Sequence, residues 1–530
     1  MAVTPLSSIV LQLAREIGGG DPTAELAVAL ACQATQAGHV CADLDREAGW
    51  GPWVAQMDAA QRADFRARLG GLSSVGGDAD WTPLVLDGSR LYLRRYRDYE
   101  LRVARDLLAR AGRVAPLAAA LAARLESVFP DAGQRAAACI ALERRLCLVS
   151  GGPGTGKTHA LARIIGLLRE QEPGLRVGLA APTGKAAARM AEALAAAGTA
   201  LPPQGAMTLH RLLGMRSDGG CRHDRARPLA LDALVVDEAS MIDLSLMAHL
   251  LDALPPAARL ILLGDRDQLA AVEAGAVFAD LCASTALAAS VAPLTTSFRF
   301  GGAIGGLAVA LRSGDAEATL GLLRTGGTEL EWRTGGDARA LLAAARAGHA
   351  PFRAAVAQGL PPAELFERFT AFRVLCAHRH EVAAINRALA QAEEGGIAAG
   401  LPVMVVRNDP LLRLFNGDIG LALPDPADGE LKACFPLDGD FRWIAFARLP
   451  EWEPAWAMTV HKSQGSEFAR VLLALPDEPS PVATRELVYT GITRAREGVA
   501  LWADEAVLRS AVACRAERMS GLREILRAGA

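Results

Sequence analysis

The chain is 530 residues long, carries a formal net charge of −3 and is 51% apolar, which is enough for two to four domains with sizeable cores. No apolar run approaches the roughly 20 residues that span a bilayer, and the start lacks the basic-then-apolar layout of a secretory signal, so we expect a cytoplasmic protein. Nine cysteines without a C-x-x-C pair argue against a zinc ribbon, an iron–sulfur cluster or a disulfide framework, and the nearly neutral charge by itself indicates neither a membrane nor a nucleic-acid partner.

The first part of the chain, residues 1–112, contains no nucleotide-binding motif. Helical periodicity dominates its beginning, and "LVLDGSRLYLRRY" (84–96) predicts a hairpin with Asp87-Gly88 at its turn. A helical pattern follows over 98–110. We predict a small, mostly helical amino-terminal domain that serves as an interaction or scaffold module.

Short apolar runs alternate with helical stretches from about residue 134 onward, a pattern that predicts parallel sheets with helices on both faces. The expected strands are 146–150, 177–181, 233–237, 260–264, 373–377, 470–475 and 498–503. We interpret them as two tandem α/β domains, 113–295 and 296–530. A short insertion is expected at about 212–230, and a small β insertion at about 402–455.

The stretch "SGGPGTGKTHA" contains G-x-x-x-x-G-K-[ST] directly after an apolar strand, the context that a phosphate-binding loop requires. Its glycines let backbone N–H groups converge on phosphates, Lys157 reaches the β and γ oxygens, and Thr158 ligates Mg²⁺. We therefore predict ATP binding by Gly151, Gly152, Pro153, Gly154, Thr155, Gly156, Lys157 and Thr158.

Polar side chains follow the third and fourth expected strands of the first α/β domain, 233–237 and 260–264. Asp237 ends an apolar strand, where its carboxylate would hold Mg²⁺, and Glu238 beside it would deprotonate the attacking water. Gln268, just past the next strand, can contact the γ-phosphate. Of 56 basic residues only four are lysine, and three of those lie in motifs, which indicates a need for a compact ammonium there.

Motifs along the chain resemble, in sequence and in order, the superfamily 1 helicases and, within them, the RecD group. The amino-terminal stretches "AGHVCADL" and "LYLRRYRDYE" are similar to the amino-terminal domain of that group. The resemblance covers Gln134 and the segments "GGPGTGKT", "APTGKAAARM", "TLHRLLG", "VVDEAS", "LLGDRDQL", "LTTSFR", "AMTVHKSQGSEF" and "ELVYTGITRARE".

The resemblance implies two RecA-like domains with an SH3-like β insertion, and ATP-driven 5′→3′ translocation on single-stranded DNA with unwinding of double-stranded DNA. It implies RecB-like and RecC-like partner subunits in double-strand break repair, with nuclease activity in a partner. Gln134 would recognise adenine, Arg299 and Arg494 would be arginine fingers, and Gln464 and Glu467 would face the nucleotide. DNA contacts would come from Thr183, Lys185, His210, Thr459 and His461.

Two alternatives stay open at this point: a motor that acts alone, and a binding subunit whose ATPase is an assembly switch without translocation. A third idea is weaker. "PDPADGELK" superficially matches the acidic pattern of metal-dependent nucleases, but Asp425 and Glu430 are separated by turn residues, so we expect an ordinary hairpin turn there.

Overall fold

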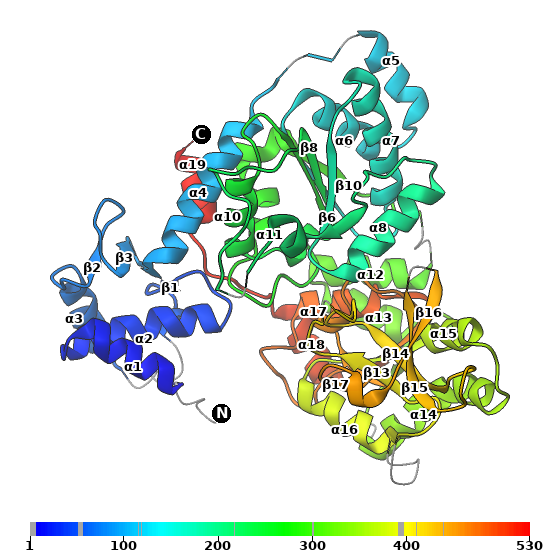
Figure 1. Ribbon diagram of the computed structural model, residues 1–530. Coiled ribbons are helices and arrows are strands. Elements are labelled where there is room, and N and C mark those ends of the chain that lie inside the picture. Colours follow the sequence, from blue (N-terminus) through cyan, green and yellow to red (C-terminus); the bar gives the residue numbers. More distant parts are fainter. Residues whose placement is uncertain are drawn as a thin grey trace.

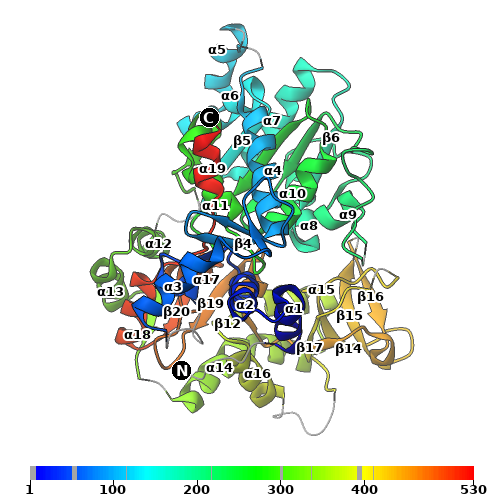
Figure 2. The same ribbon diagram turned by 90° about the vertical axis from the view of Figure 1, so that its left-hand side faces the viewer.

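The computed structural model describes residues 7–50, 57–114, 116–117, 119–216, 218–298, 302–335, 337–390, 397–409, 411–437 and 439–529. Three parts follow each other along the chain (Figure 1): an amino-terminal domain, lobe 1 (113–295) and lobe 2 (302–513). The amino-terminal domain projects to one side of the two lobes (Figures 1 and 2).

The amino-terminal domain packs three helices, α1 (Ser8–Gly18), α2 (Pro22–Gln36) and α3 (Ala59–Leu69), with a four-stranded sheet of order β1-β4-β3-β2. The strands are β1 (Ala42–Asp43), β2 (Val75–Gly76), β3 (Leu84–Asp87) and β4 (Arg90–Leu93). The predicted hairpin forms, because β3 and β4 pair antiparallel with Asp87 opposite Arg90. Asp21 begins α2 by accepting hydrogen bonds from the next backbone N–H groups.

Helix α4 (Arg94–Ala111) leads directly from β4 into lobe 1. Its inner face, including Tyr99, Val103 and Leu107, belongs to one apolar core with strands and helices of lobe 1. Sequence periodicity predicts this helix but does not show that it packs on lobe 1. Because α4 buries its apolar face against lobe 1, the amino-terminal domain is fixed to that lobe and shares its core.

Lobe 1 is built on a six-stranded parallel sheet of order β10-β5-β9-β8-β6-β7. The sequence predicts a parallel sheet and four of these strands, but not β7 and β10. One face packs on α6 (Ala132–Glu143), α7 (Lys157–Gln171) and α8 (Gly184–Ala196); the other packs on α4, α9 (Leu209–Leu213), α10 (Leu244–Ala253) and α11 (Val277–Ala283). The strands are β5 (Leu146–Gly151), β6 (Val177–Ala181), β7 (Ala206–Thr208), β8 (Ala233–Val236), β9 (Arg259–Gly264) and β10 (Val291–Leu294).

Lobe 2 is a second α/β unit, with a five-stranded parallel sheet of order β11-β20-β19-β12-β18. Helices α12 (Ala303–Ser313), α13 (Ala316–Thr325), α17 (Arg485–Ile492) and α18 (Glu505–Ala513) cover one face, and α14 (Ala338–Ala357), α15 (Pro362–Ala371) and α16 (Arg379–Ala390) cover the other. The strands are β11 (Leu330–Arg333), β12 (Phe372–Cys376), β18 (Ala457–Thr459), β19 (Phe468–Ala474) and β20 (Ala495–Trp502).

The predicted β insertion of lobe 2 is a five-stranded antiparallel sheet of order β16-β15-β14-β13-β17. Its hairpin at 425–430 is closed by Lys432, whose ammonium donates to Asp425 at 2.8 Å and to Asp428. The segment thus forms a hairpin turn, as we expected, and Asp425 and Asp428 are ion-paired in it. The strands are β13 (Pro402–Val405), β14 (Ile419–Pro424), β15 (Leu431–Leu437), β16 (Asp440–Ile444) and β17 (Trp452–Pro454).

After α18 the chain leaves lobe 2 and returns to lobe 1, where α19 (Leu522–Ala528) lies against α4 and α11 (Figure 1). The sequence assigns all of 296–530 to the second α/β domain, and the structure differs in this last part. The reason is packing: Leu522 and Leu526 are buried in the core that α4 shares with lobe 1.

We call residues 514–521 the C-terminal strap, because this segment contacts all three parts of the molecule. On lobe 2, the Arg485 N–H donates to the Cys514 carbonyl at 2.8 Å. On lobe 1, the Arg518 guanidinium donates to the Ala271 carbonyl at 3.2 Å. On the amino-terminal domain, the Val40 N–H donates to the Met519 carbonyl at 2.8 Å.

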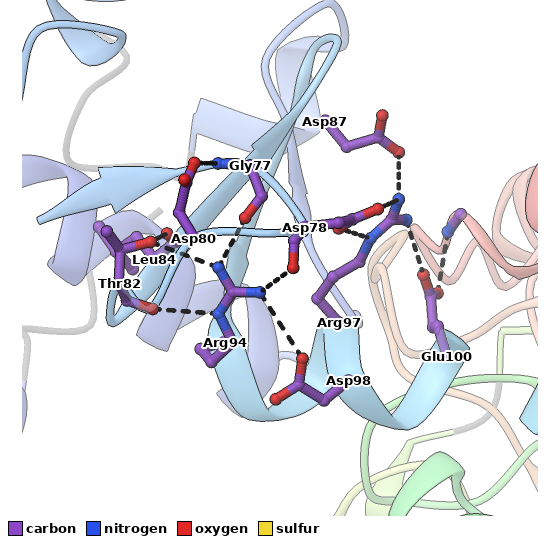
Figure 3. A network of polar contacts seen from close by, with 11 residues as sticks. Gly77, Asp78, Asp80, Thr82, Leu84, Asp87, Arg94, Arg97, Asp98 and Glu100 are labelled. Atoms are coloured by element: carbon purple, nitrogen blue, oxygen red, sulfur yellow. Dashed lines mark hydrogen bonds and ion pairs between the residues drawn. The ribbon is translucent and has the colours of Figure 1, made fainter. Parts of the chain in front are cut away.

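A polar network secures the strap beside α4 (Figure 3). Glu100, which is fully buried, accepts hydrogen bonds from the Ser520 hydroxyl at 2.8 Å and the Gly521 N–H at 2.9 Å. Arg97 lies 3.8 Å from Glu100 and makes a two-pronged contact with Asp78 at 2.8 Å. The network therefore ties the amino-terminal domain to the strap through α4.

None of the helices in the described residues is long and apolar enough to cross a membrane.

Candidate active site

The phosphate-binding loop connects β5 to α7. Gly154 and Gly156 adopt left-handed backbone angles, with φ of 79° and 76°, which only glycine adopts without strain. The Lys157 ammonium lies inside the curve of the loop and donates to the carbonyls of Gly151 and Gly152, the second at 3.1 Å. The hydroxyl of Thr155 also donates to the Gly152 carbonyl, at 2.8 Å, and stiffens the turn.

The loop has the shape and donors that a nucleotide triphosphate with Mg²⁺ requires. A Cβ atom at Gly152 would lie 2.8 Å from the Tyr489 hydroxyl, and one at Gly156 would lie 2.7 Å from the Gln134 amide. A larger residue at either position would therefore displace the tyrosine hydroxyl or the glutamine amide. The amino end of α7, the ammonium and the nearby hydroxyl and carboxylate of Thr158 and Asp237 fit phosphates and a hard cation.

The outer rim of the loop carries Gln134 and Phe298. The Gln134 side chain is buried and donates to the Thr155 carbonyl at 3.3 Å, while Asp131 caps its helix α6. The Phe298 N–H donates to the Gly154 carbonyl at 2.9 Å, and its ring is 63% exposed beside Gly156. An exposed aromatic face next to an amide is suited to hold a planar base.

The acidic pair stands where β8 ends. The Asp237 carboxylate accepts the Glu238 N–H at 2.9 Å, and Glu238 has the unusual φ of 52° for a residue other than glycine. Burial, followed by the charge of Glu238, raises the pKa of Asp237, while Lys157 acts in the opposite direction. A carboxylate held this way gains by binding a cation, which removes the cost of its buried charge.

A hydrogen-bonded cluster joins the loop after β9 to helix α17 of lobe 2. The Asp265 carboxylate, 2% exposed, accepts the Tyr489 hydroxyl at 2.9 Å and the Gln268 amide at 3.1 Å. Next to it, the Leu269 N–H donates to the Thr490 hydroxyl at 2.9 Å. The cluster lies beside the phosphate-binding loop, since Gly152 is close to Tyr489 and Asp265.

The predicted residues of lobe 2 lie at the boundary between the lobes. Arg494 is 3% exposed and donates to the Thr490 and Ser466 carbonyls. Burial lowers its pKa, and the negative charges of Glu238 and Glu467 oppose this shift. The other predicted arginine finger, Arg299, lies outside the described residues.

Gln464 and Glu467 contact lobe 1, and their role at the nucleotide stays a prediction. The Gln464 amide donates to the Leu269 carbonyl at 2.8 Å. Glu467 forms an ion pair with Arg189 at 2.9 Å, and Arg189 also donates to the Gly465 carbonyl at 2.8 Å. Arg189, on α8, thus ties the two lobes together.

The predicted DNA-contacting residues come from both lobes. Thr183 caps α8 and lies close to Gly465 of lobe 2; Lys185 and His210 are exposed on lobe 1. In lobe 2, Thr459 is buried at the wall of a cavity of about 770 Å³, and His461 follows it. Three basic side chains line the same cavity: Arg379, Arg387 and Lys462.

Comparisons with known proteins divide the chain in a similar way. Residues 5–92 match the family model for the RecBCD enzyme subunit RecD, N-terminal domain. Residues 134–274 match an AAA domain, and residues 454–502 match a UvrD-like helicase C-terminal domain. The RecBCD enzyme subunit RecD of Mycobacterium tuberculosis is 42% identical over 96% of this chain and 92% of that protein.

The chain belongs to the RecD family. Two further comparisons of this RecD-family chain show lower identity. The ATP-dependent RecD2 DNA helicase of Deinococcus radiodurans is 35% identical over 67% of this chain and 46% of that protein. Among solved structures, the Pif1 helicase of Candida albicans is 19% identical, with a TM-score of 0.44, over 78% of this chain and 98% of that one.

Several residues of this RecD-family site were missed by sequence reasoning. Asp265 and Tyr489 stood inside quoted motifs, yet nothing in the sequence shows that they meet, because they are 224 residues apart. Phe298 could have been found as the apolar residue beside Arg299. Arg189 is one of many arginines and carries no local signal.

Proposed function

We propose that this chain is an ATP-driven 5′→3′ translocase on single-stranded DNA, the motor subunit of a RecBCD-type helicase–nuclease. It would act in the cytoplasm, in double-strand break repair and homologous recombination. The observation that carries the proposal is the composite ATP site. Lys157 and Glu238 come from lobe 1 and the buried Arg494 comes from lobe 2, so hydrolysis requires the two lobes to meet.

In this site each side chain has one task. The loop N–H groups and Lys157 bind the phosphates, and Gln134 with Phe298 holds the adenine. Thr158 and Asp237 would hold Mg²⁺, which when bound neutralises phosphate charge. Glu238 accepts the proton of the attacking water, and Arg494 stabilises the charge that develops on the transferred phosphoryl group. A second finger, Arg299, is proposed from the motif alone.

Movement follows if the grip on DNA alternates with closure of the lobes. Thr183, Lys185 and His210 would hold the strand on lobe 1, and Thr459 and His461 would hold it on lobe 2. Hydroxyls, single positive charges and backbone N–H groups suit phosphate contacts, which carry no sequence information. A motor that must pass any sequence needs contacts of this kind.

Partner chains enter the proposal through the family. The Mycobacterium tuberculosis relative, named as a RecBCD enzyme subunit, matches almost end to end, and the amino-terminal family model matches too. The RecD2 DNA helicase relative, in contrast, is matched over less than half of its length. We therefore propose RecB-like and RecC-like partners, with nuclease activity in a partner. Residues Gln464 and Glu467 would then transmit closure between the lobes of this motor.

An unwinding assay with the complex tests the proposal. Duplexes with a 5′ tail or a 3′ tail are compared, in complexes that contain the wild-type chain or its Lys157→Gln variant, with partner motors inactivated. We expect ATP-dependent unwinding only from the 5′ tail and only with Lys157 present. ATP hydrolysis without any strand separation or translocation would favour the assembly-switch alternative, and an active single chain that fails to co-purify with two large subunits would favour the stand-alone motor.

A further inference from the structure

The cluster of Tyr489, Asp265 and Gln268 contains a hydrogen-bond constraint that the motifs do not reveal. The Asp265 Oδ2 atom accepts two hydrogen bonds, one from Tyr489 Oη at 2.9 Å and one from Gln268 Nε2 at 3.1 Å. Because a carboxylate can only accept, the glutamine must turn its NH₂ group toward Asp265. Its carbonyl oxygen then faces the other way.

That carbonyl oxygen is buried and has no hydrogen-bond partner among the residues that the structure describes. Gln268 is 6% exposed, so its oxygen cannot simply turn to bulk solvent. A buried acceptor without a donor costs free energy, which marks a group that is completed by something else. An acceptor oxygen attracts the hydrogen of a water molecule or hydroxyl, and it repels a phosphate oxygen.

From this geometry we infer that Tyr489 is a positioning residue for ATP hydrolysis. Its hydroxyl holds Asp265, and Asp265 holds Gln268 with the amide oxygen directed at the attacking water. This inference rests on the proposed ATPase function of the site. It changes the predicted role of Gln268, because in this arrangement the side chain orients water and does not donate to the γ-phosphate.

Three further observations support a role for Tyr489 that depends on lobe closure. Tyr489 belongs to lobe 2, while Asp265 and Gln268 belong to lobe 1, so the constraint exists only when the lobes meet. Gly152 of the phosphate-binding loop leaves the space for the tyrosine hydroxyl. Burial, together with the Asp265 charge, raises the pKa of Tyr489, so it stays a donor.

The same helix links this constraint to the arginine finger. The Arg494 guanidinium donates to the Thr490 carbonyl, one residue after Tyr489, and the Leu269 N–H donates to the Thr490 hydroxyl. When α17 docks on lobe 1, the same movement therefore positions both the Arg494 guanidinium and the water-orienting Gln268 side chain.

The test is a double-mutant cycle on DNA-stimulated ATP hydrolysis by the assembled complex, with partner ATPases inactivated. Tyr489→Phe keeps the ring and removes the hydroxyl; we expect kcat to fall about tenfold while KM for ATP stays within about twofold. Gln268→Ala should lower kcat at least as much. In the Gln268→Ala background, Tyr489→Phe should have no further effect, because its target is gone.

Tyr96→Phe, on α4 and partly buried against the core that this helix shares with lobe 1, is the matched control and should leave kcat unchanged. If Tyr489→Phe does not fold, Asp265→Asn replaces it, since an amide can donate to the Gln268 oxygen and reverse that side chain. The inference would be overturned if the double variant lost kcat by the product of the two single losses. It would also be overturned if Tyr489→Phe kept the wild-type kcat. If the wild type hydrolyses ATP and Lys157→Gln does not, such a result leaves the proposed function intact.

Discussion

Two cations of different character define the site at the scale of single residues. Lys157 lies part-buried within its own loop, where its ammonium donates to backbone carbonyls. Arg494 is almost completely buried in lobe 2, yet it makes its hydrogen bonds to carbonyl groups. A cation placed in this way keeps its charge available for an anion. Against the effect of burial, the charge of Lys157 lowers the pKa of Asp237, and the charge of Glu238 raises the pKa of Arg494.

Lys157→Gln should abolish ATP hydrolysis, with a loss on the order of 10²–10³ or more, since it removes a preorganised positive charge from the phosphates. Glutamine can still donate to the loop carbonyls, so folding should be spared. Steady-state ATPase rates and thermal melting check this. Lys432→Gln in the β insertion is the control; it breaks ion pairs with Asp425 and Asp428 and should leave hydrolysis unchanged.

Arg494→Lys retains the charge but not the planar group that reaches Thr490 and Ser466 together. We expect kcat to fall on the order of 10³-fold, the lower range for loss of an arginine finger, with little change in nucleotide affinity. Single-turnover hydrolysis and binding of a fluorescent ATP analogue separate the two effects. A fall in affinity with unchanged kcat would contradict the assignment.

At the scale of elements, the residues at the amino ends of α6 and α7 determine where several side chains of the site lie. The Asp131 side chain accepts a hydrogen bond from the Gln134 N–H at 2.9 Å and so caps the start of α6. This cap places Gln134, in the first turn of the helix, beside the phosphate-binding loop. Gly156 holds the corresponding position before α7 without a capping side chain, and its left-handed backbone lets the loop turn into the helix. Small local signals therefore place side chains that act together.

Asp131→Ala should cost about 1 kcal/mol of stability, the usual effect of losing a helix cap, and should also raise KM for ATP by displacing Gln134. Asp58→Ala is the matched control. Asp58 caps α3 in the amino-terminal domain in the same way, accepting the Gln61 N–H at 2.8 Å. It should lose similar stability without any change in KM, as urea unfolding and steady-state kinetics will show.

Sequence patterns captured these elements because their causes are local. The apolar runs of β5 and β8 are buried on both faces, and the turn residues of the loop after β5 can be recognised without knowing the fold. The contact of Tyr489 with Asp265 and the return of α19 to lobe 1 depend on tertiary packing between distant segments. Neither leaves a periodic signal in the chain.

The junction at Glu100 matters at the scale of the whole molecule, because it joins α4 to the C-terminal strap (Figure 3). Burial is the main cause that raises the pKa of Glu100 to about 7, against the hydrogen bonds from Ser520 and Gly521. The unfolded chain would titrate near the ordinary value of about 4.3. The folded state therefore holds a proton that the unfolded state releases between these two values.

The sign of the pH effect follows from that difference. The favourable contribution of protonated Glu100 is complete below about pH 4 and is lost as the pH rises to about 7. Glu100→Gln, a neutral isostere that keeps an acceptor oxygen, should remove this loss. We expect the difference between the urea midpoints of the variant and the wild type to grow in favour of the variant from pH 5 to pH 8. A difference that does not change with pH would show that Glu100 stays charged in the folded protein.

The C-terminal strap also fixes how the motor can move. The chain passes from lobe 1 to lobe 2 once between β10 and α12, and it comes back through residues 514–521. If a single segment joined the two lobes, they could rotate and translate freely relative to each other. Because two separate segments join them, the main motion left is a rotation about the line through the two segments. Each ATP cycle would thus rotate lobe 2 relative to lobe 1 about one fixed axis. The amino-terminal domain would stay with lobe 1, because it shares the core of that lobe.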